Sequence, residues 1–116
     1  MMYRVELSAQ AKEDMREIYE YIAFELRAID STEALFRHLE EHIYALEEMP
    51  ERYRLYEGEP WRTHGLRVMP VDHYLVFYIP NHESRIVTVI RILYGGRDSA
   101  AQLARYTENN DMTALQ

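Results

Sequence analysis

Residues 91–103 read RILYGGRDSAAQL and join an apolar β-type run to a helix. The run ends at Gly95 and Gly96, whose backbones permit the dihedral angles that stop a strand abruptly. Ser99 and Gln102 then have the spacing of a capping box, which predicts that a short helix begins there. The stretch is therefore predicted to be a strand, a tight turn and a final helix.

Arg97 falls in that turn, at the end of the predicted strand and beside the start of the helix. Strand ends and loops carry a large share of functional side chains. Two interpretations stay open at this point: Arg97 contributes to a site, or it pairs with Asp98 and fixes the turn.

Upstream of this stretch, residues 66–71, 73–79 and 85–94 form three predicted strands. PNHES, at 80–84, separates the last two and has the residues of a turn, which predicts a hairpin. Both of these strands are apolar at odd and even positions alike, a pattern typical of central strands that are covered on two faces.

The N-terminal half has a short alternating strand at 3–7 and then two amphipathic helices. Ser8 is a plausible N-cap for a helix over 9–26, and a second helix spans 30–48 and ends before Pro50. A short link between two helices predicts an antiparallel helical hairpin.

The predicted fold is α+β, with the order β-α-α-β-β-β, a short C-terminal helix, and the helical hairpin packed on a small, mostly antiparallel sheet. Residues 50–65 have no periodicity and are predicted to form a loop. The single domain is predicted to span 1–106, and the polar residues 107–116 are predicted to form a flexible tail.

The 116 residues carry a net charge of −7, which argues against broad nucleic-acid binding. The charge is uneven, because residues 60–105 hold six Arg and only three acids. Arg recognises phosphate and carboxylate groups by a fixed planar geometry. The second half is therefore where a partner surface is predicted, although ordinary surface Arg balancing nearby acids explains the charge equally well.

The sequence has no Cys, no apolar run long enough to span a bilayer and no recognisable signal peptide. These features predict a cytoplasmic protein. No cofactor and no metal is predicted.

Several stretches resemble the RelE/ParE superfamily of toxins from type II toxin–antitoxin systems. They are YRVELSAQAKEDMREIYEYI at 3–22, LEEMPERYR at 46–54, YLVFY at 74–78 and IRILYGGRD at 90–98. The resemblance covers residues 3–104, and its specificity comes from the order and spacing of these pieces.

This resemblance implies a growth-inhibiting toxin, of the kind that also stabilises plasmids, which a cognate antitoxin neutralises. RelE-like members cleave mRNA on the ribosome, and ParE-like members inhibit DNA gyrase. A degenerate member that only binds its antitoxin is a third interpretation.

For a RelE-like ribonuclease, the resemblance points to Arg67, Tyr74 and Arg97 as catalytic residues. The chain departs from that pattern in three ways: its second half has no Lys, Tyr74 stands where RelE-like enzymes place a sheet Arg, and Leu103 stands where they place an aromatic or His residue. Arg alone is a poor general base. We therefore favour a ParE-like toxin that binds its target through four residues: Arg67, Arg91, Tyr94 and Arg97. A structural ion pair is the alternative for Arg91, since it lies inside a central strand.

Other candidate groups are better explained by structure. His38 and His42 match H-x-x-E-H, an inverted zinc-protease pattern, but no third ligand is apparent. The other candidate histidines, at 64, 73 and 82, lie at predicted loops or strand edges, where a solvated His is common. Trp61 faces either a partner or the core.

Overall fold

The structure is a computed structural model that describes residues 2–25, 29–95 and 99–109. Its elements are, in order, β1 (Arg4–Leu7), α1 (Ala9–Glu20), a π-helical turn (Tyr21–Glu25), α2 (Ile29–Tyr44), two 3₁₀ turns (Ala45–Glu47 and Pro50–Arg52), β2 (Arg67–Val71), β3 (Tyr74–Asn81), β4 (Ile86–Tyr94) and α3 (Ser99–Asn109). This order confirms the predicted β-α-α-β-β-β arrangement with a C-terminal helix.

The four strands form one mixed sheet in the order β1-β4-β3-β2. The pairs β2–β3 and β3–β4 are antiparallel, whereas β1 runs parallel to β4. The helical hairpin causes this parallel pairing, since it carries the chain from β1 back across the sheet before the three later strands form a meander.

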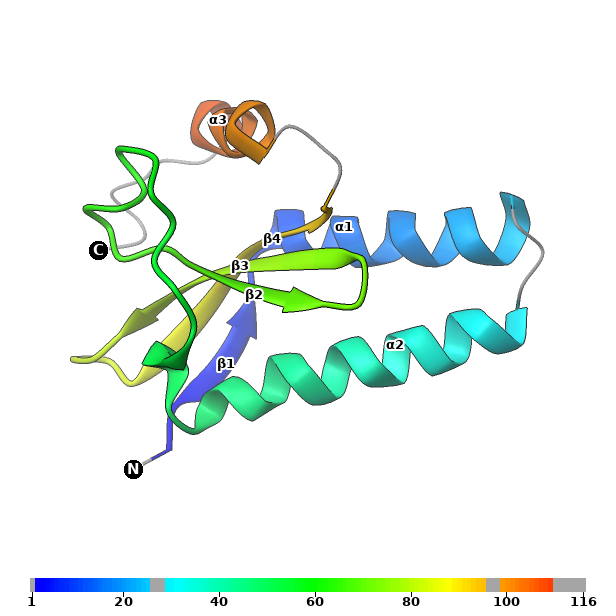
Figure 1. Cartoon of the computed structure of the whole chain (residues 1–116), viewed down its shortest axis with the longest axis horizontal. Coiled ribbons are helices and arrows are strands. Elements are labelled where there is room, and N and C mark those ends of the chain that lie inside the picture. The colour runs from blue at the N-terminus through cyan, green and yellow to red at the C-terminus, as the bar shows by residue number, and fades with distance from the viewer. Residues whose placement is uncertain (1, 26–28, 96–98, 110–116) are drawn as a thin grey trace.

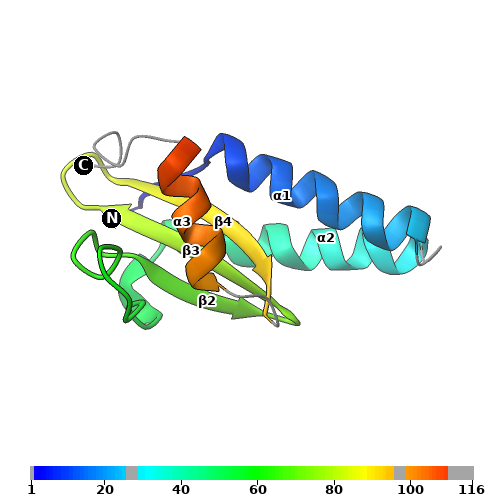
Figure 2. The ribbon, with the colours of Figure 1, turned by 90° about the horizontal axis from the view of Figure 1, so that it is seen from above.

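The helical hairpin and α3 cover opposite faces of the sheet (Figures 1 and 2). α1 and α2 lie side by side and extend beyond the end of the sheet, and α3 crosses β3 and β4 on the other side. The central strands are therefore buried on both faces, which explains why they are apolar at odd and even positions.

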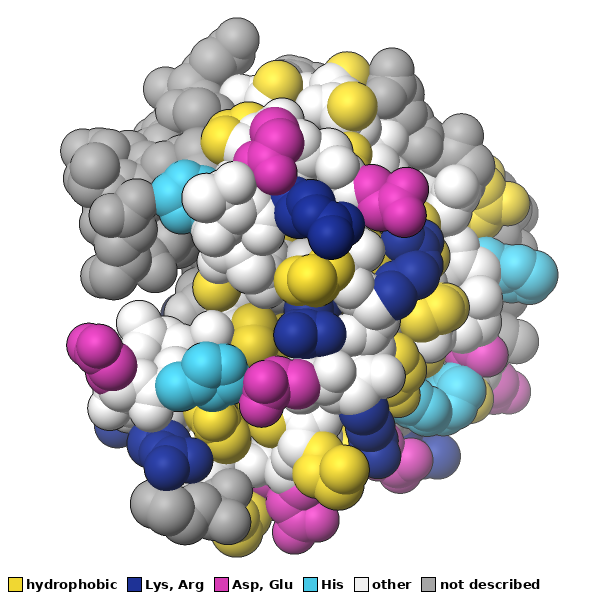
Figure 3. All heavy atoms as spheres, turned by 60° about the vertical axis from the view of Figure 1, so that its left-hand side comes forward, with side chains coloured by type: hydrophobic (Ala, Val, Ile, Leu, Met, Phe, Trp, Pro, Cys, Tyr) yellow, Lys and Arg dark blue, Asp and Glu magenta, His cyan; other side chains and the backbone are white. Residues whose placement is uncertain are grey.

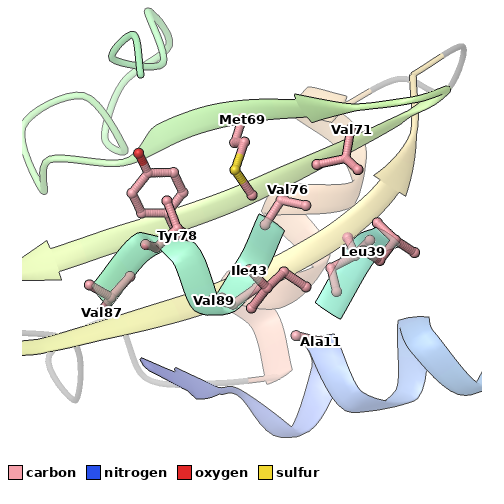
Figure 4. Packing of buried hydrophobic residues seen from close by; sticks show 11 residues of the cluster. Ala11, Leu39, Ile43, Met69, Val71, Val76, Tyr78, Val87 and Val89 are labelled. Atoms are coloured by element: carbon pink, nitrogen blue, oxygen red, sulfur yellow. The ribbon is translucent and has the colours of Figure 1, made fainter. Parts of the chain in front are cut away.

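The hairpin side contains the larger core cluster (Figure 4). Its buried members are Ala11, Leu39, Ile43, Leu46, Met69, Val71, Val76, Tyr78, Val87, Val89 and Ile92. A second cluster lies on the α3 side, where Leu103 of α3 packs with Phe77 and Trp61. Trp61 is 4% exposed, so of the two interpretations given for it, the core is correct.

Local sequence signals set several boundaries. The Ser8 hydroxyl caps α1 by accepting a hydrogen bond from the Ala11 amide at 3.0 Å, as predicted. The Asn81 side chain accepts from the amides of Glu83 and Ser84 at 3.0 Å each, and this turn joins β3 to β4. α3 begins at Ser99, also as predicted.

Some boundaries differ from the predicted ones. The first helix changes to a π-helical turn after Glu20, and the second becomes a 3₁₀ turn after Tyr44. α3 runs to Asn109. The domain end at 106 and the flexible tail stay predictions, and residues 110–116 lie outside the described residues. Within the described part of the chain, no helix has the length and apolar character needed to cross a membrane.

Tyr78 provides a test of the packing on the hairpin side. Its side chain is fully buried, and its hydroxyl donates to the Pro50 carbonyl oxygen at 2.6 Å. Burial is the main cause that raises the pKa of this hydroxyl above its usual value. A raised pKa favours the neutral phenol in the folded state, so the resulting stability is complete below the unfolded pKa of about 10 and is lost as pH rises above it.

We predict that Tyr78→Phe lowers the free energy of unfolding by about 1 kcal/mol at neutral pH, because it leaves the Pro50 carbonyl without its donor. The variant should also lose stability less steeply than the wild type above pH 10. Urea denaturation followed by Trp61 fluorescence measures both effects. Tyr44→Phe, at a tyrosine that is 51% exposed, is the matched control and should behave as the wild type. Identical curves for wild type and Tyr78→Phe would contradict the prediction.

Candidate functional site

Arg91 lies in β4 and forms a buried ion pair with Asp14 of α1. The two residues are 5% and 4% exposed. Nε and Nη2 of Arg91 each donate to one carboxylate oxygen of Asp14 at 2.8 Å, and Nη1 donates to the Gln102 carbonyl oxygen of α3 at 3.0 Å. Three nitrogens of the guanidinium group are thus bound, and the group connects β4 to both α1 and α3.

A β-bulge places Arg91 in this position. Phe77 pairs with Arg91 but Tyr78 pairs with Val89, so Ile90 is an extra residue in β4. Because a bulge shifts the alternation of side chains, Arg91 lies opposite Phe77 on the α3 side of the sheet. We therefore assign Arg91 a structural role and leave it out of the proposed target surface.

Arg67 lies at the start of β2 and is fixed by backbone carbonyls. Its Nη1 donates to the carbonyl oxygens of Glu51 at 3.0 Å and Tyr53 at 2.7 Å. Both hydrogens of Nη1 are then used, and the plane of the guanidinium is set. Among the described residues, none bonds to the other edge, which consists of Nε and Nη2.

Arg52, which the sequence alone did not indicate, lies between Glu51 and Tyr53, the two residues whose carbonyls bind Arg67. Its guanidinium carbon is 5.4 Å from the ring centre of Tyr53, whose carbonyl binds Arg67. Both arginines act on the same buried hydroxyl, since each lowers the pKa of Tyr78 against the dominant effect of burial. We call Arg52 and Arg67 the arginine pair.

Tyr74 and Tyr94 form a second group at the other end of the strands. They are register partners in β3 and β4, and their rings pack edge to face with centres 5.9 Å apart. Tyr94 is 52% exposed and Tyr74 is half-buried. Burial raises the pKa of Tyr74, and Tyr94 and Tyr21 raise it further, so the phenol is protonated at neutral pH and is a poor general base.

The predicted site residues therefore do not form one cluster. Arg67 pairs with Tyr78, which is four residues from Tyr74 along β3, a rise of roughly 13 Å. Arg91 is buried between these two ends, and Arg97 lies outside the described residues. Within the described part of the chain, the structure brings Tyr74 together with Tyr94, and Arg67 together with the turn that carries Arg52.

The end of the sheet that carries the arginine pair has a mixed surface. On the face that Figure 3 shows, basic and acidic side chains are interspersed, and no continuous basic stripe is visible. Glu51 has an exposed carboxylate that lies 3.6 Å from His82, and the Tyr3 hydroxyl is 2.6 Å from the same ring. This mixture of basic and acidic side chains suits the binding of one anionic group better than the binding of a long polyanion such as a nucleic-acid backbone.

The histidine motif on α2 is part of a contact between elements. His38 Nδ1 lies 2.7 Å from a carboxylate oxygen of Asp72 in the β2–β3 turn, and His42 Nδ1 lies 2.9 Å from the His38 carbonyl oxygen. The described residues contain no group of three or more His, Cys, Asp or Glu side chains placed to hold a metal.

Comparison with known proteins identifies the family. Residues 5–99, most of the chain, match the family model described as the ParE toxin of the type II toxin–antitoxin system parDE. The chain belongs to this family. The resemblance to the RelE/ParE superfamily is thereby confirmed. No curated protein matches.

Solved structures with the same fold include both branches of the superfamily. The chromosomal ParDE system from P. aeruginosa has a TM-score of 0.65 at 14% identity, covering 80% of this chain and 96% of that one. A mutant of E. coli RelE in the free state has a TM-score of 0.64 at 14% identity, with 97% and 100% covered. The toxin–antitoxin complex RelBE2 from Mycobacterium tuberculosis has a TM-score of 0.56 at 17% identity, with 81% and 99% covered. The fold alone does not separate the two branches.

The ion pair between Asp14 and Arg91 yields a stability prediction. Asp14→Ala should lower the free energy of unfolding by about 3–5 kcal/mol, since it leaves a buried guanidinium without its counter-ion. Arg91→Met should also destabilise, and the double variant should lose less than the sum of the two single variants. Urea denaturation of all four proteins gives the coupling energy.

Glu17→Ala is the control for this cycle, because Glu17 is an exposed acid on the same helix and should have little effect. Additive losses in the cycle would show that the pair is not coupled and would contradict the structural role of Arg91.

Proposed function

We propose that this type II toxin is ParE-like and inhibits DNA gyrase by binding, and that a cognate antitoxin neutralises it. Gyrase as the target places its action in the cytoplasm. Arg67 and Tyr94 are the described residues proposed to contact the target, and Arg97 is proposed to join them.

The observation that supports this proposal is the separation of the groups that RNA cleavage needs. A ribonuclease has to activate a hydroxyl, stabilise charge and protonate a leaving group around one phosphate. Among the described residues, Arg67 and Tyr74 lie at opposite ends of paired strands. A surface that only binds does not require these groups to meet.

The antitoxin is proposed from two observations. The family is defined as toxins of toxin–antitoxin systems, and one of the similar structures is a complex of such a toxin with its antitoxin. Exposed aromatic side chains give the toxin surface that a partner can bury: Tyr21 is 56% exposed and Phe24 is 70% exposed.

Induced expression in bacteria tests the target. We predict filamentation and induction of the DNA-damage response, because gyrase poisoning breaks DNA, and relief when the neighbouring antitoxin gene is co-expressed. Rapid arrest of translation with cleaved messages would contradict the proposal and indicate a RelE-like mRNA interferase. Normal growth together with antitoxin binding would indicate a degenerate member.

Variants in the same assay test the surface. Arg67→Ala and Tyr94→Ala should each raise survival after induction by at least about tenfold, since truncation of Arg and Tyr anchors typically costs more than 1 kcal/mol of binding. Arg37→Ala changes an exposed arginine on α2 that has no ion pair in the described part of the chain, and it should stay as toxic as the wild type. Equal toxicity of all three variants would remove Arg67 and Tyr94 from the target surface.

A further inference from the structure

The free edge of Arg67 is a prepared binding site for one planar anion. Its Nη1 is held by two carbonyl oxygens, at 2.7 and 3.0 Å, so the side chain is already ordered before any partner arrives. Nε and Nη2 lie on the opposite edge and point their hydrogens in parallel, which is the geometry of bidentate carboxylate and phosphate binding. Ordering in advance reduces the entropy lost on binding.

Arg52 adds a second positive charge in the same turn, since it lies between Glu51 and Tyr53, the two residues whose carbonyls hold Arg67. It is exposed and stacks over the ring of Tyr53. In the described part of the chain, neither Arg52 nor Arg67 is within ion-pair distance of a carboxylate, although the protein has 20 acids to 13 bases. A guanidinium edge without a carboxylate partner, with a second unpaired arginine in the adjoining turn, favours an external anion.

A carboxylate fits this place better than a nucleic-acid backbone does. Binding of a nucleic-acid backbone requires several basic side chains along its path and a positive electrostatic potential around them. Here Glu51 directly precedes Arg52 and keeps an exposed carboxylate, and basic and acidic side chains are interspersed on the face that Figure 3 shows. A single Asp or Glu side chain needs only one guanidinium edge. It is small enough to bind there without the repulsion from neighbouring acids that an extended polyanion would meet.

We propose that an acidic side chain of the cognate antitoxin binds the Nε/Nη2 edge of Arg67, with Arg52 in the adjoining turn adding positive charge, and so occupies the arginine that would contact the target. This inference rests on the proposed function, and it names the partner of that same site. Neutralisation would then include direct competition for Arg67.

The test uses the purified toxin and the antitoxin encoded by the neighbouring gene, with affinity measured by calorimetry at two salt concentrations. Arg67→Lys retains the charge but not the bidentate edge, and we expect it to weaken binding about tenfold or more. Arg52→Ala, which leaves the carbonyl contacts of Arg67 intact, should weaken binding less and reduce its salt dependence. Arg37→Ala is the matched control and should bind as the wild type does.

Neutralising the acids of the antitoxin one at a time identifies the partner group. One Asp→Asn or Glu→Gln change in the antitoxin should weaken binding as much as Arg67→Lys does in the toxin. When that antitoxin variant is mixed with the Arg67→Lys toxin, the affinity should fall no further than with either change alone. Thermal denaturation of each free toxin variant is measured in parallel, since loss of folding would lower the active fraction without changing the salt dependence.

The outcomes separate this inference from the proposed function. If the wild-type toxin binds no antitoxin, the proposed function itself fails. If the antitoxin binds wild type and Arg67→Lys equally, the inference is overturned and the function stands. If Arg67→Lys weakens binding of a single-stranded RNA probe and not of the antitoxin, the site is for phosphate and the inference is equally overturned.

Discussion

The buried pair of Asp14 and Arg91 holds the end of the sheet in place. β1 pairs with β4 only as far as Val89, so the rest of that edge of β4 needs other partners. The start of α1 supplies them: the Ser8 hydroxyl donates to the Ile90 carbonyl oxygen at 2.8 Å, and Asp14 accepts from the Ile92 amide at 2.9 Å. An unpaired buried amide would be costly, so Asp14 satisfies the backbone and the guanidinium together.

This constraint explains why the predicted recognition surface is divided. Arg91 is used to connect α1, β4 and α3, and it is not available to a partner. The groups that reach the surface lie on either side of it, with half-buried Arg67 and exposed Arg52 at one end of the strands and half-buried Tyr74 and exposed Tyr94 at the other. Two separate contact areas on a rigid sheet suit a protein that engages large partners, and they do not suit concerted chemistry at one atom.

Much of the fold was predictable, because its signals are local. The cap at Ser8, the turn at Asn81 and the apolar strands each follow from a few neighbouring residues. The bulge at Ile90 was not predictable in this way, since it depends on how two strands align, and it determines where Arg91 points.

The site was harder to predict than the fold, because its members come from distant parts of the chain. Asp14 had one available signal, an acid beside Ala11 and Met15 on the apolar stripe of α1, but its partner lies 77 residues away. Arg52 falls in a stretch without periodicity, and only its stacking on Tyr53, whose carbonyl binds Arg67, gives it a role. Arg67 and Tyr74 are close in sequence but lie at opposite ends of β2 and β3, because the strands run antiparallel.

Incubation of the purified toxin with DNA gyrase and supercoiled plasmid tests most directly whether this protein acts by binding rather than by cleaving RNA. Binding to gyrase predicts loss of supercoiling activity and accumulation of cleaved plasmid–gyrase complexes at stoichiometric toxin. Unaffected gyrase, together with cleavage of mRNA on programmed ribosomes by the same toxin preparation, would contradict it.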